Sequence, residues 1–181
     1  MKTRRRQSEK SRRRAVGSGL LDLHHACLRN ADDLLEEAEL LLSHGKAPRA
    51  FMLAFTALEE LGKSQLVADY FNDMVAKAEF DEAFRDHRLK LKYLQRVVDA
   101  PSTTGGAWTI EYENELPLPE PQRRMDSLYV HYKERFEPVM PAKKISKEDA
   151  STLIREVREA IDETRELSYF TERFGTKAFT K

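Results

Sequence analysis

The sequence predicts an all-α protein, a helical bundle of about five helices, and three observations lead to this prediction. Apolar residues recur at three- and four-residue steps over most of the chain, which is the period of an amphipathic helix. Charged residues make up 34% of the chain and hydrophobic residues 40%, a balance typical of helices with one buried and one charged face. The 181 residues are enough for one domain, and no internal repeat indicates a solenoid.

The N-terminal segment differs from the rest of the chain in charge. Residues 1–14 carry eight Lys or Arg and one acidic residue, Glu9, whereas acidic residues outnumber basic ones in the remainder. Residues 1–18 lack apolar periodicity, so we expect a disordered basic tail, followed by the helical bundle over 19–172 and a C-terminal tail over 173–181. The basic tail could bind RNA phosphates, or it could simply be solvated.

Apolar spacing and helix-breaking residues predict where the helices lie. A first helix runs from Leu20 and ends before Gly45, and a second follows Pro48 towards Tyr70. A third helix runs from Phe84 to Ala100 and ends before Pro101.

The second half of the chain contains a predicted loop and two further helices. Residues 101–121 hold four prolines and two glycines, so they predict a long irregular connection, in which residues 108–112 could alternate as a short strand. A fourth helix is expected over 123–136. Ser146 and Asp149 are spaced like a helix cap, and they predict a fifth helix that continues to Leu167.

Several classes of protein are excluded by residues that the chain lacks. Cys27 is the only cysteine, so neither an intramolecular disulfide nor a zinc site with two thiolates can form. No stretch reaches the roughly 20 apolar residues that span a membrane. No histidine follows a glutamate by three residues, as di-iron bundles require, and no phosphate-binding loop occurs. We therefore expect a cytoplasmic protein with no membrane segment, metal or cofactor.

The most distinctive motif is Glu59-Glu60-Leu61-Gly62-Lys63 in the second predicted helix. Lys63 lies four residues after Glu59 and three after Glu60, so it can pair with either carboxylate. Such a pair could be an ordinary surface ion pair. Because Glu60 lies close to the apolar face, it could instead be a partly buried carboxylate that supports a functional site.

This motif and two later segments carry a resemblance to a known family. Residues 49–63 resemble the signature of the AbiV-type abortive-infection family of the HEPN superfamily, in which small and apolar residues lead into Glu-Glu-x-Gly-Lys. Residues 84–90 and 124–130 also resemble that family's pattern, in the expected order. The resemblance covers roughly residues 20–170 and implies a HEPN-like helical bundle.

The resemblance also implies candidate catalytic residues. HEPN ribonucleases use an Arg, four to six intervening residues and a His, and Arg124 and His131 enclose six. If this segment is helical, a seven-residue step places both side chains on one face, roughly 10 Å apart along the axis. Alternatively, His131 is a solvent-facing or aromatic-packed histidine.

His87 is the second candidate, because it lies beside a basic cluster that includes Arg85 and Lys90. Basic neighbours would favour a neutral imidazole that can accept a proton, and the cluster could also bind RNA. The alternative is a histidine on a helix surface.

The function that the resemblance implies is antiphage abortive infection by a metal-independent endoribonuclease that arrests translation. RNA would be the substrate, and HEPN ribonucleases commonly act as homodimers, so Tyr129 and Tyr132 could be interface residues or core residues. The alternative function is a non-catalytic module that blocks translation by binding RNA or a phage or host protein. A structural bundle paired with an antitoxin protein is a third reading.

Overall fold

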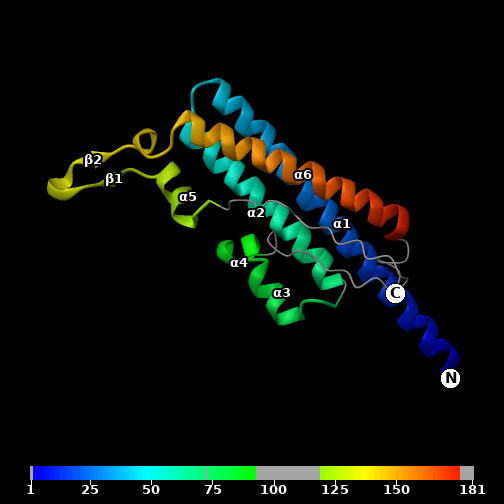
Figure 1. Ribbon diagram of the computed structural model, residues 1–181. Helices are drawn as coiled ribbons and strands as arrows, with labels where there is room; N and C mark the ends of the chain where they lie inside the picture. The colour runs from blue at the N-terminus through cyan, green and yellow to red at the C-terminus, as the bar shows by residue number, and fades with distance from the viewer. Residues whose placement is uncertain (1, 72, 93–118, 176–181) are drawn as a thin grey trace, which may run out of the picture.

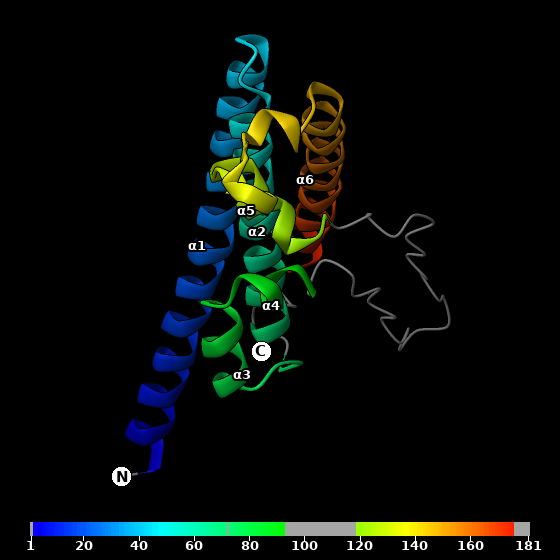
Figure 2. The same ribbon diagram turned by 90° about the vertical axis from the view of Figure 1, so that its left-hand side faces the viewer.

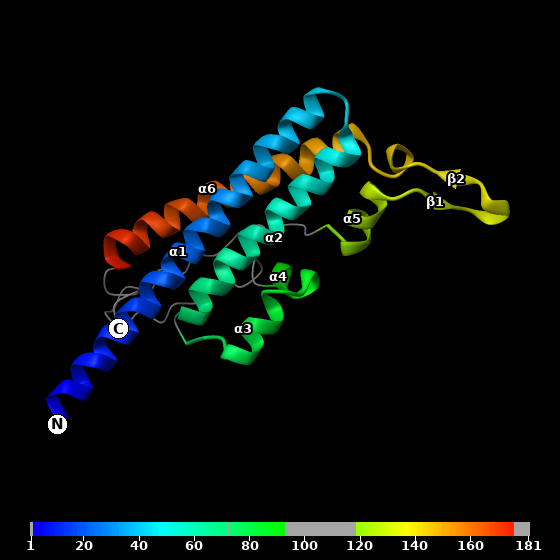
Figure 3. The ribbon, with the colours of Figure 1, turned by 180° about the vertical axis from the view of Figure 1, so that it is seen from behind.

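The computed structural model describes the backbone of residues 2–71, 73–92 and 119–175, and the side chains of 19–71, 73–87, 89–91 and 119–165. Three long helices form the body of the protein, namely α1 (Lys2–Ser43), α2 (Ala47–Phe71) and α6 (Lys147–Gly175). They lie side by side in Figures 1 and 3, and each contacts the other two. The described residues are mostly helical and contain little strand, which confirms the predicted all-α fold.

The core lies between these three helices. Phe51, Phe55 and Leu58 of α2 are almost completely buried between Leu35 of α1 and Val157 of α6. Their three- and four-residue spacing places them on the inner face of α2, as the sequence predicts. A smaller apolar cluster packs the end of α2 against α3 (Lys77–Ala83).

Two helix boundaries confirm predictions from the sequence. Gly45 has a φ of 71°, and its N–H and that of Lys46 donate to the carbonyls of Leu42 and Leu41, a Schellman ending for α1. At the start of α6, the Asp149 N–H donates to Ser146 Oγ, and the Ser146 N–H donates to the Asp149 carboxylate. This reciprocal pair is a capping box.

The third predicted helix is divided in the structure. Phe84 caps the end of α3 instead of lying inside a helix, and a turn at residues 85–86 precedes α4 (His87–Lys92). Apolar spacing alone could not reveal this break, because Phe84 and Leu91 pack inward on either side of it. The rest of the predicted helix and loop, residues 93–118, lies outside the described residues.

The fourth predicted helix is shorter than expected. Helix α5 (Pro121–Leu128) ends where Tyr129 becomes extended, and two short strands follow, β1 (His131–Tyr132) and β2 (Pro138–Val139). They pair antiparallel, with His131 opposite Val139, on either side of the 3-10 turn η2 (Glu134–Phe136). The prediction of a helix to residue 136 is wrong, because His131 and Tyr132 pair with Val139 and Pro138 as a two-stranded ribbon instead.

We call residues 129–140 the hairpin arm. In Figure 1 the arm extends away from the three long helices, and a second 3-10 turn, η3 (Pro141–Lys143), connects it to α6. Arg135 and Phe136 both have a φ of 61° at the end of the arm.

The chain termini extend the long helices. Helix α1 begins at Lys2, within the segment for which we expect disorder, and α6 reaches Gly175, within the expected C-terminal tail. No helix within the described ranges has a stretch both long and apolar enough to cross a membrane.

Candidate functional site

A buried carboxylate lies at the centre of the candidate site. The Glu59 side chain is only 3% exposed, and it lies on α2 among buried residues that are mostly apolar. Helices α4 and α5 both pack against α2 (Figure 2), and each contributes one side chain to this carboxylate. A buried carboxylate is costly unless other groups satisfy it, so its partners indicate its role.

The first partner of Glu59 is His87, the first residue of α4. The Nδ1–H of His87 donates to Oε2 of Glu59 over 2.8 Å. The imidazole is 56% exposed, so the ring bridges a buried acceptor and the surface. Because an ionised carboxylate only accepts, this bond fixes the proton on Nδ1 and leaves Nε2 as the acceptor in the neutral ring.

The second partner is Arg124 on α5. Its Nε lies 3.8 Å from Oε1 of Glu59, too far for a hydrogen bond but within ion-pair distance. Among the described residues, neither Arg124 Nε nor Glu59 Oε1 has a hydrogen-bond partner, although both atoms are buried. The guanidinium is therefore attracted to this carboxylate, but its Nε–H is not used in a hydrogen bond to it.

The neighbouring carboxylate has a different partner. Glu60 pairs with Lys63 at 2.5 Å, with 13% and 18% of the two side chains exposed. The Lys63 ammonium also lies 5.2 Å from the centre of the Phe84 ring, at the end of α3. The pair is thus partly buried, and it joins α2 to α3 through a cation–π contact.

Gly62 allows α4 to approach α2 closely. A Cβ at this position would lie 2.4 Å from the backbone carbonyl oxygen of Lys90, a distance that real atoms do not adopt. The glycine of the Glu-Glu-x-Gly-Lys motif therefore sets the position of α4, and with it that of His87 and Lys90.

Lys90 itself is buried, with 5% of the residue exposed. Burial lowers the pKa of its ammonium, and the nearby charge of Lys63 lowers it further, while Glu59 and Glu60 raise it. Cys27 of α1 lies near the same charges, and burial raises the pKa of its thiol to about 11. Cys27 is therefore a protonated thiol at neutral pH and unsuited to nucleophilic chemistry.

His131 lies in a separate group at the base of the hairpin arm. Its Nε2 is 3.1 Å from Oδ1 of Asp126, but the two groups are not aligned as a hydrogen bond, and Nε2 is buried. Lys144 lies 3.5 Å from the other oxygen of Asp126. Because α5 ends before His131, the helical argument that places Arg124 and His131 on one face does not apply.

The structure therefore brings together Glu59, His87 and Arg124, which the sequence analysis names in three separate groups. The clustering of these residues depends on how α4 and α5 pack on α2, which no local pattern reveals. Arg85 lies exposed in the turn before α4. Asp126 and Lys144 were not among the expected site residues, although Asp126 lies within the segment 124–130 that carries the family resemblance.

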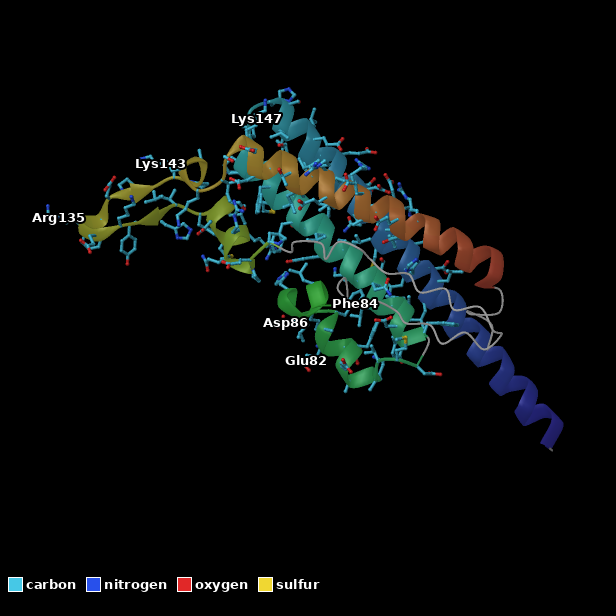
Figure 4. All side chains as sticks on the ribbon, viewed as in Figure 1. Glu82, Phe84, Asp86, Arg135, Lys143 and Lys147 are labelled. Atoms are coloured by element: carbon cyan, nitrogen blue, oxygen red, sulfur yellow. The ribbon has the colours of Figure 1, made fainter. Side chains whose placement is uncertain are left out.

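The hairpin arm forms a second notable surface. Five large apolar side chains of the arm are exposed by 52% or more, namely Tyr129, Val130, Tyr132, Phe136 and Met140, and Met125 of the adjoining α5 is 43% exposed. Figure 4 shows Arg135 at the outer end of the arm and Lys143 nearer the long helices. Such a concentration of exposed apolar side chains is unusual on a protein surface and typically marks an interaction surface.

Within the described ranges, no group of three or more His, Cys, Asp or Glu side chains could hold a metal ion.

Comparison with known proteins identifies the family. Searches of the curated proteins and of the solved structures gave no match. A family model described as AbiV, within the HEPN class, matches residues 19–162, which include the bundle, Glu59, His87 and Arg124. The chain therefore belongs to the AbiV family of the HEPN superfamily.

Proposed function

We propose that this protein acts in antiphage abortive infection as a metal-independent endoribonuclease that cleaves RNA in the cytoplasm and so arrests translation. Membership of the AbiV family supports the defence role. The observation that carries the enzymatic part is the joint contact of His87 and Arg124 with the buried carboxylate of Glu59.

In the proposed mechanism, His87 is the general base. Glu59 holds Nδ1–H, so Nε2 accepts the proton of a ribose 2′-hydroxyl, and Glu59 stabilises the imidazolium that forms. The 2′-oxygen then attacks the adjacent phosphorus in line. Since the nucleophile belongs to the substrate, the products carry a 2′,3′-cyclic phosphate, and DNA does not react.

Arg124 stabilises the negative charge that develops on the phosphate. The distance of 3.8 Å to Glu59 and the unpaired Nε leave the guanidinium able to turn towards a phosphate oxygen. A charge-assisted, bidentate contact of this kind is the interaction that arginine forms best with phosphates.

His131 remains the alternative base. The geometry favours His87, because His87 shares the buried carboxylate of Glu59 with Arg124, whereas His131 lies beside Asp126 in a separate group. His131 better suits a role in attaching the arm to α5.

We also propose that the hairpin arm joins two copies of the chain. Its exposed aromatic and methionine side chains are of the types enriched in protein interfaces. The arm also carries both Lys133 and Arg135 and both Glu134 and Glu137. A two-fold interface pairs a patch with itself, so a surface with both signs of charge is self-complementary.

The same arm supports the alternative function, a non-catalytic module that blocks translation by occupancy. In that case the exposed apolar residues would bind a phage, host or antitoxin protein, and the charged cluster at Glu59 would only be structural. Cleavage distinguishes the two functions directly.

The test measures cleavage of purified cellular RNA by the wild-type protein, with and without EDTA. We expect cleavage in both conditions, with 2′,3′-cyclic phosphate ends. His87→Ala should reduce the rate by roughly 10²- to 10⁴-fold. Two matched controls, His131→Ala and His44→Ala, should retain most activity; His44 is an exposed histidine near the end of α1.

Three results would contradict parts of the proposal. Full cleavage by His87→Ala with loss in His131→Ala would transfer the base to His131. Loss of cleavage in EDTA would require a metal. Full toxicity without cleavage in the wild type would establish the occupancy function.

A further inference from the structure

Lys90 is the buried charged residue of the site that the mechanism above leaves unused. Only 5% of the residue is exposed. Removing an ammonium from water is costly, so the groups that surround Lys90 bear directly on its role.

The fold holds Lys90 at this position through two features. Lys90 follows His87 by three residues on α4, so both side chains lie on the same side of that short helix. Gly62 of α2 lies directly against the Lys90 backbone, where a Cβ would come within 2.4 Å of the carbonyl oxygen. The motif that supplies Glu59 thus also fixes how closely the Lys90 backbone packs against α2.

The charges around Lys90 are those of the candidate site. Glu59, Glu60 and Lys63 of α2 and Arg124 of α5 all act on its ammonium, and Cys27 of α1 also interacts with it. Burial, Lys63 and Arg124 disfavour the charged form of Lys90, whereas the carboxylates of Glu59 and Glu60 favour it. A lysine in such surroundings releases its proton more readily than one in water.

We propose that Lys90 is the general acid of the reaction and protonates the 5′ oxygen that leaves when the RNA chain breaks. This inference rests on the proposed ribonuclease function. A metal-independent cleavage needs a proton at that oxygen, because an alkoxide is a poor leaving group. His87 cannot supply it in the same step, since it is then accepting a proton.

The complete step balances as follows. The 2′-hydroxyl proton passes to Nε2 of His87 while the 2′-oxygen bonds to phosphorus. The bond between phosphorus and the 5′ oxygen breaks, and that oxygen takes a proton from Nζ of Lys90. The products are a 2′,3′-cyclic phosphate and a 5′-hydroxyl, and both side chains return to their starting protonation by exchange with water.

The test uses a leaving group that needs no proton. An oligonucleotide containing one ribose at a cleavage site mapped with the wild-type protein is prepared in two forms, with oxygen or sulfur at the bridging 5′ position. Lys90→Met keeps the length of the side chain and removes its charge, so it should remain folded. We expect this variant to cleave the oxygen substrate roughly 10²- to 10⁴-fold more slowly and the sulfur substrate at nearly the wild-type rate.

The matched control is His87→Ala, which should be slow on both substrates, because both require removal of the 2′ proton. With the oxygen substrate, the wild-type rate should fall at high pH, where Lys90 loses its proton. With the sulfur substrate this fall should be absent, since the leaving group needs no proton. A Lys90→Met variant that is equally slow on both substrates, or normal on the oxygen substrate, overturns the assignment. If the wild type cleaves neither mapped RNA nor cellular RNA, the proposed function itself fails.

Discussion

The Nδ1 atom of His87 lies 2.8 Å from Oε2 of Glu59, and this contact between residues 28 positions apart in the sequence joins α4 to α2. The carboxylate is buried and the imidazole is exposed, so the contact holds a surface ring in a fixed orientation against the core. Its importance can be measured at Glu59 without altering His87.

We expect Glu59→Gln to slow RNA cleavage by at least about 10²-fold while the protein remains folded, because an amide can still accept the bond but cannot stabilise the imidazolium. The rate is measured with cellular RNA, and folding is checked by circular dichroism. Glu159→Gln is the control, since Glu159 is an exposed carboxylate of α6 outside the site. Equal rates for the two variants would show that Glu59 has no special role.

Gly62→Ala should destabilise the protein, because the new Cβ would meet the Lys90 carbonyl oxygen at 2.4 Å and backbone cannot easily move. The expected loss is about 1–3 kcal/mol, as for other overpacked sites. Gly19→Ala is the control, since no atom lies within 4 Å of its Cβ and alanine favours a helix. Urea denaturation measures both, and an unchanged midpoint for Gly62→Ala would mean that α4 is free to shift.

The sequence predicts the three long helices well because their signals are local. The apolar spacing of α2, the Gly45 ending of α1 and the Ser146–Asp149 cap of α6 all involve residues within a few positions of one another. Such patterns are read correctly because the interactions that fix the structure are also short in range.

The candidate site was only partly predictable for the opposite reason. The motif at residues 59–63 indicated importance, but the sequence favoured Glu60 as the partly buried carboxylate, whereas Glu59 is the more deeply buried one. The contacts of Glu59 with His87 and Arg124 depend on tertiary packing. Likewise, apolar spacing over residues 123–136 fits a helix, and only the pairing of β1 with β2 ends it at Leu128.

Lys63→Ala should lower the free energy of unfolding by roughly 1–3 kcal/mol, because it leaves the partly buried Glu60 carboxylate without its partner. It also removes the contact of the ammonium with the Phe84 ring. Glu159→Ala, at an exposed position of α6, is the surface control. A denaturation midpoint no lower than that of the control would indicate that water replaces the lost partner.

Acid should weaken the cap of α6. Hydrogen bonds from Arg123 and Ser146 lower the pKa of Asp149 from 3.8 to about 2. Since the folded pKa lies below the unfolded one, the stabilisation is complete above about pH 4 to 5 and is lost as the pH falls towards 2. Asp149→Ala should cost about 1 kcal/mol at neutral pH and reduce this acid-dependent loss.

Thermal denaturation of the wild type and Asp149→Ala between pH 2 and pH 7 measures how the charge of Asp149 affects stability. Asp33→Asn, at an exposed position of α1, should keep the wild-type acid profile. If Asp149→Ala and the wild type lose the same stability between pH 4 and pH 2, the cap does not depend on the charge of Asp149.

Charged substitutions at the end of the hairpin arm should separate the proposed dimer without unfolding the bundle. Tyr132 and Phe136 are 73% and 83% exposed and their ring centres lie 5.7 Å apart, so neither contributes to the monomer core. A Tyr132→Asp, Phe136→Asp double variant should therefore keep the wild-type melting temperature, because surface changes of this kind alter stability by about 0.5 kcal/mol or less. The mass measured by light scattering after size-exclusion chromatography should change from that of a dimer to that of a monomer.

The control is Leu40→Asp, which places the same charge at an exposed apolar position of α1, outside the arm. This variant should leave the dimer intact. A wild type that is already monomeric would assign the arm to another protein partner and favour the occupancy function.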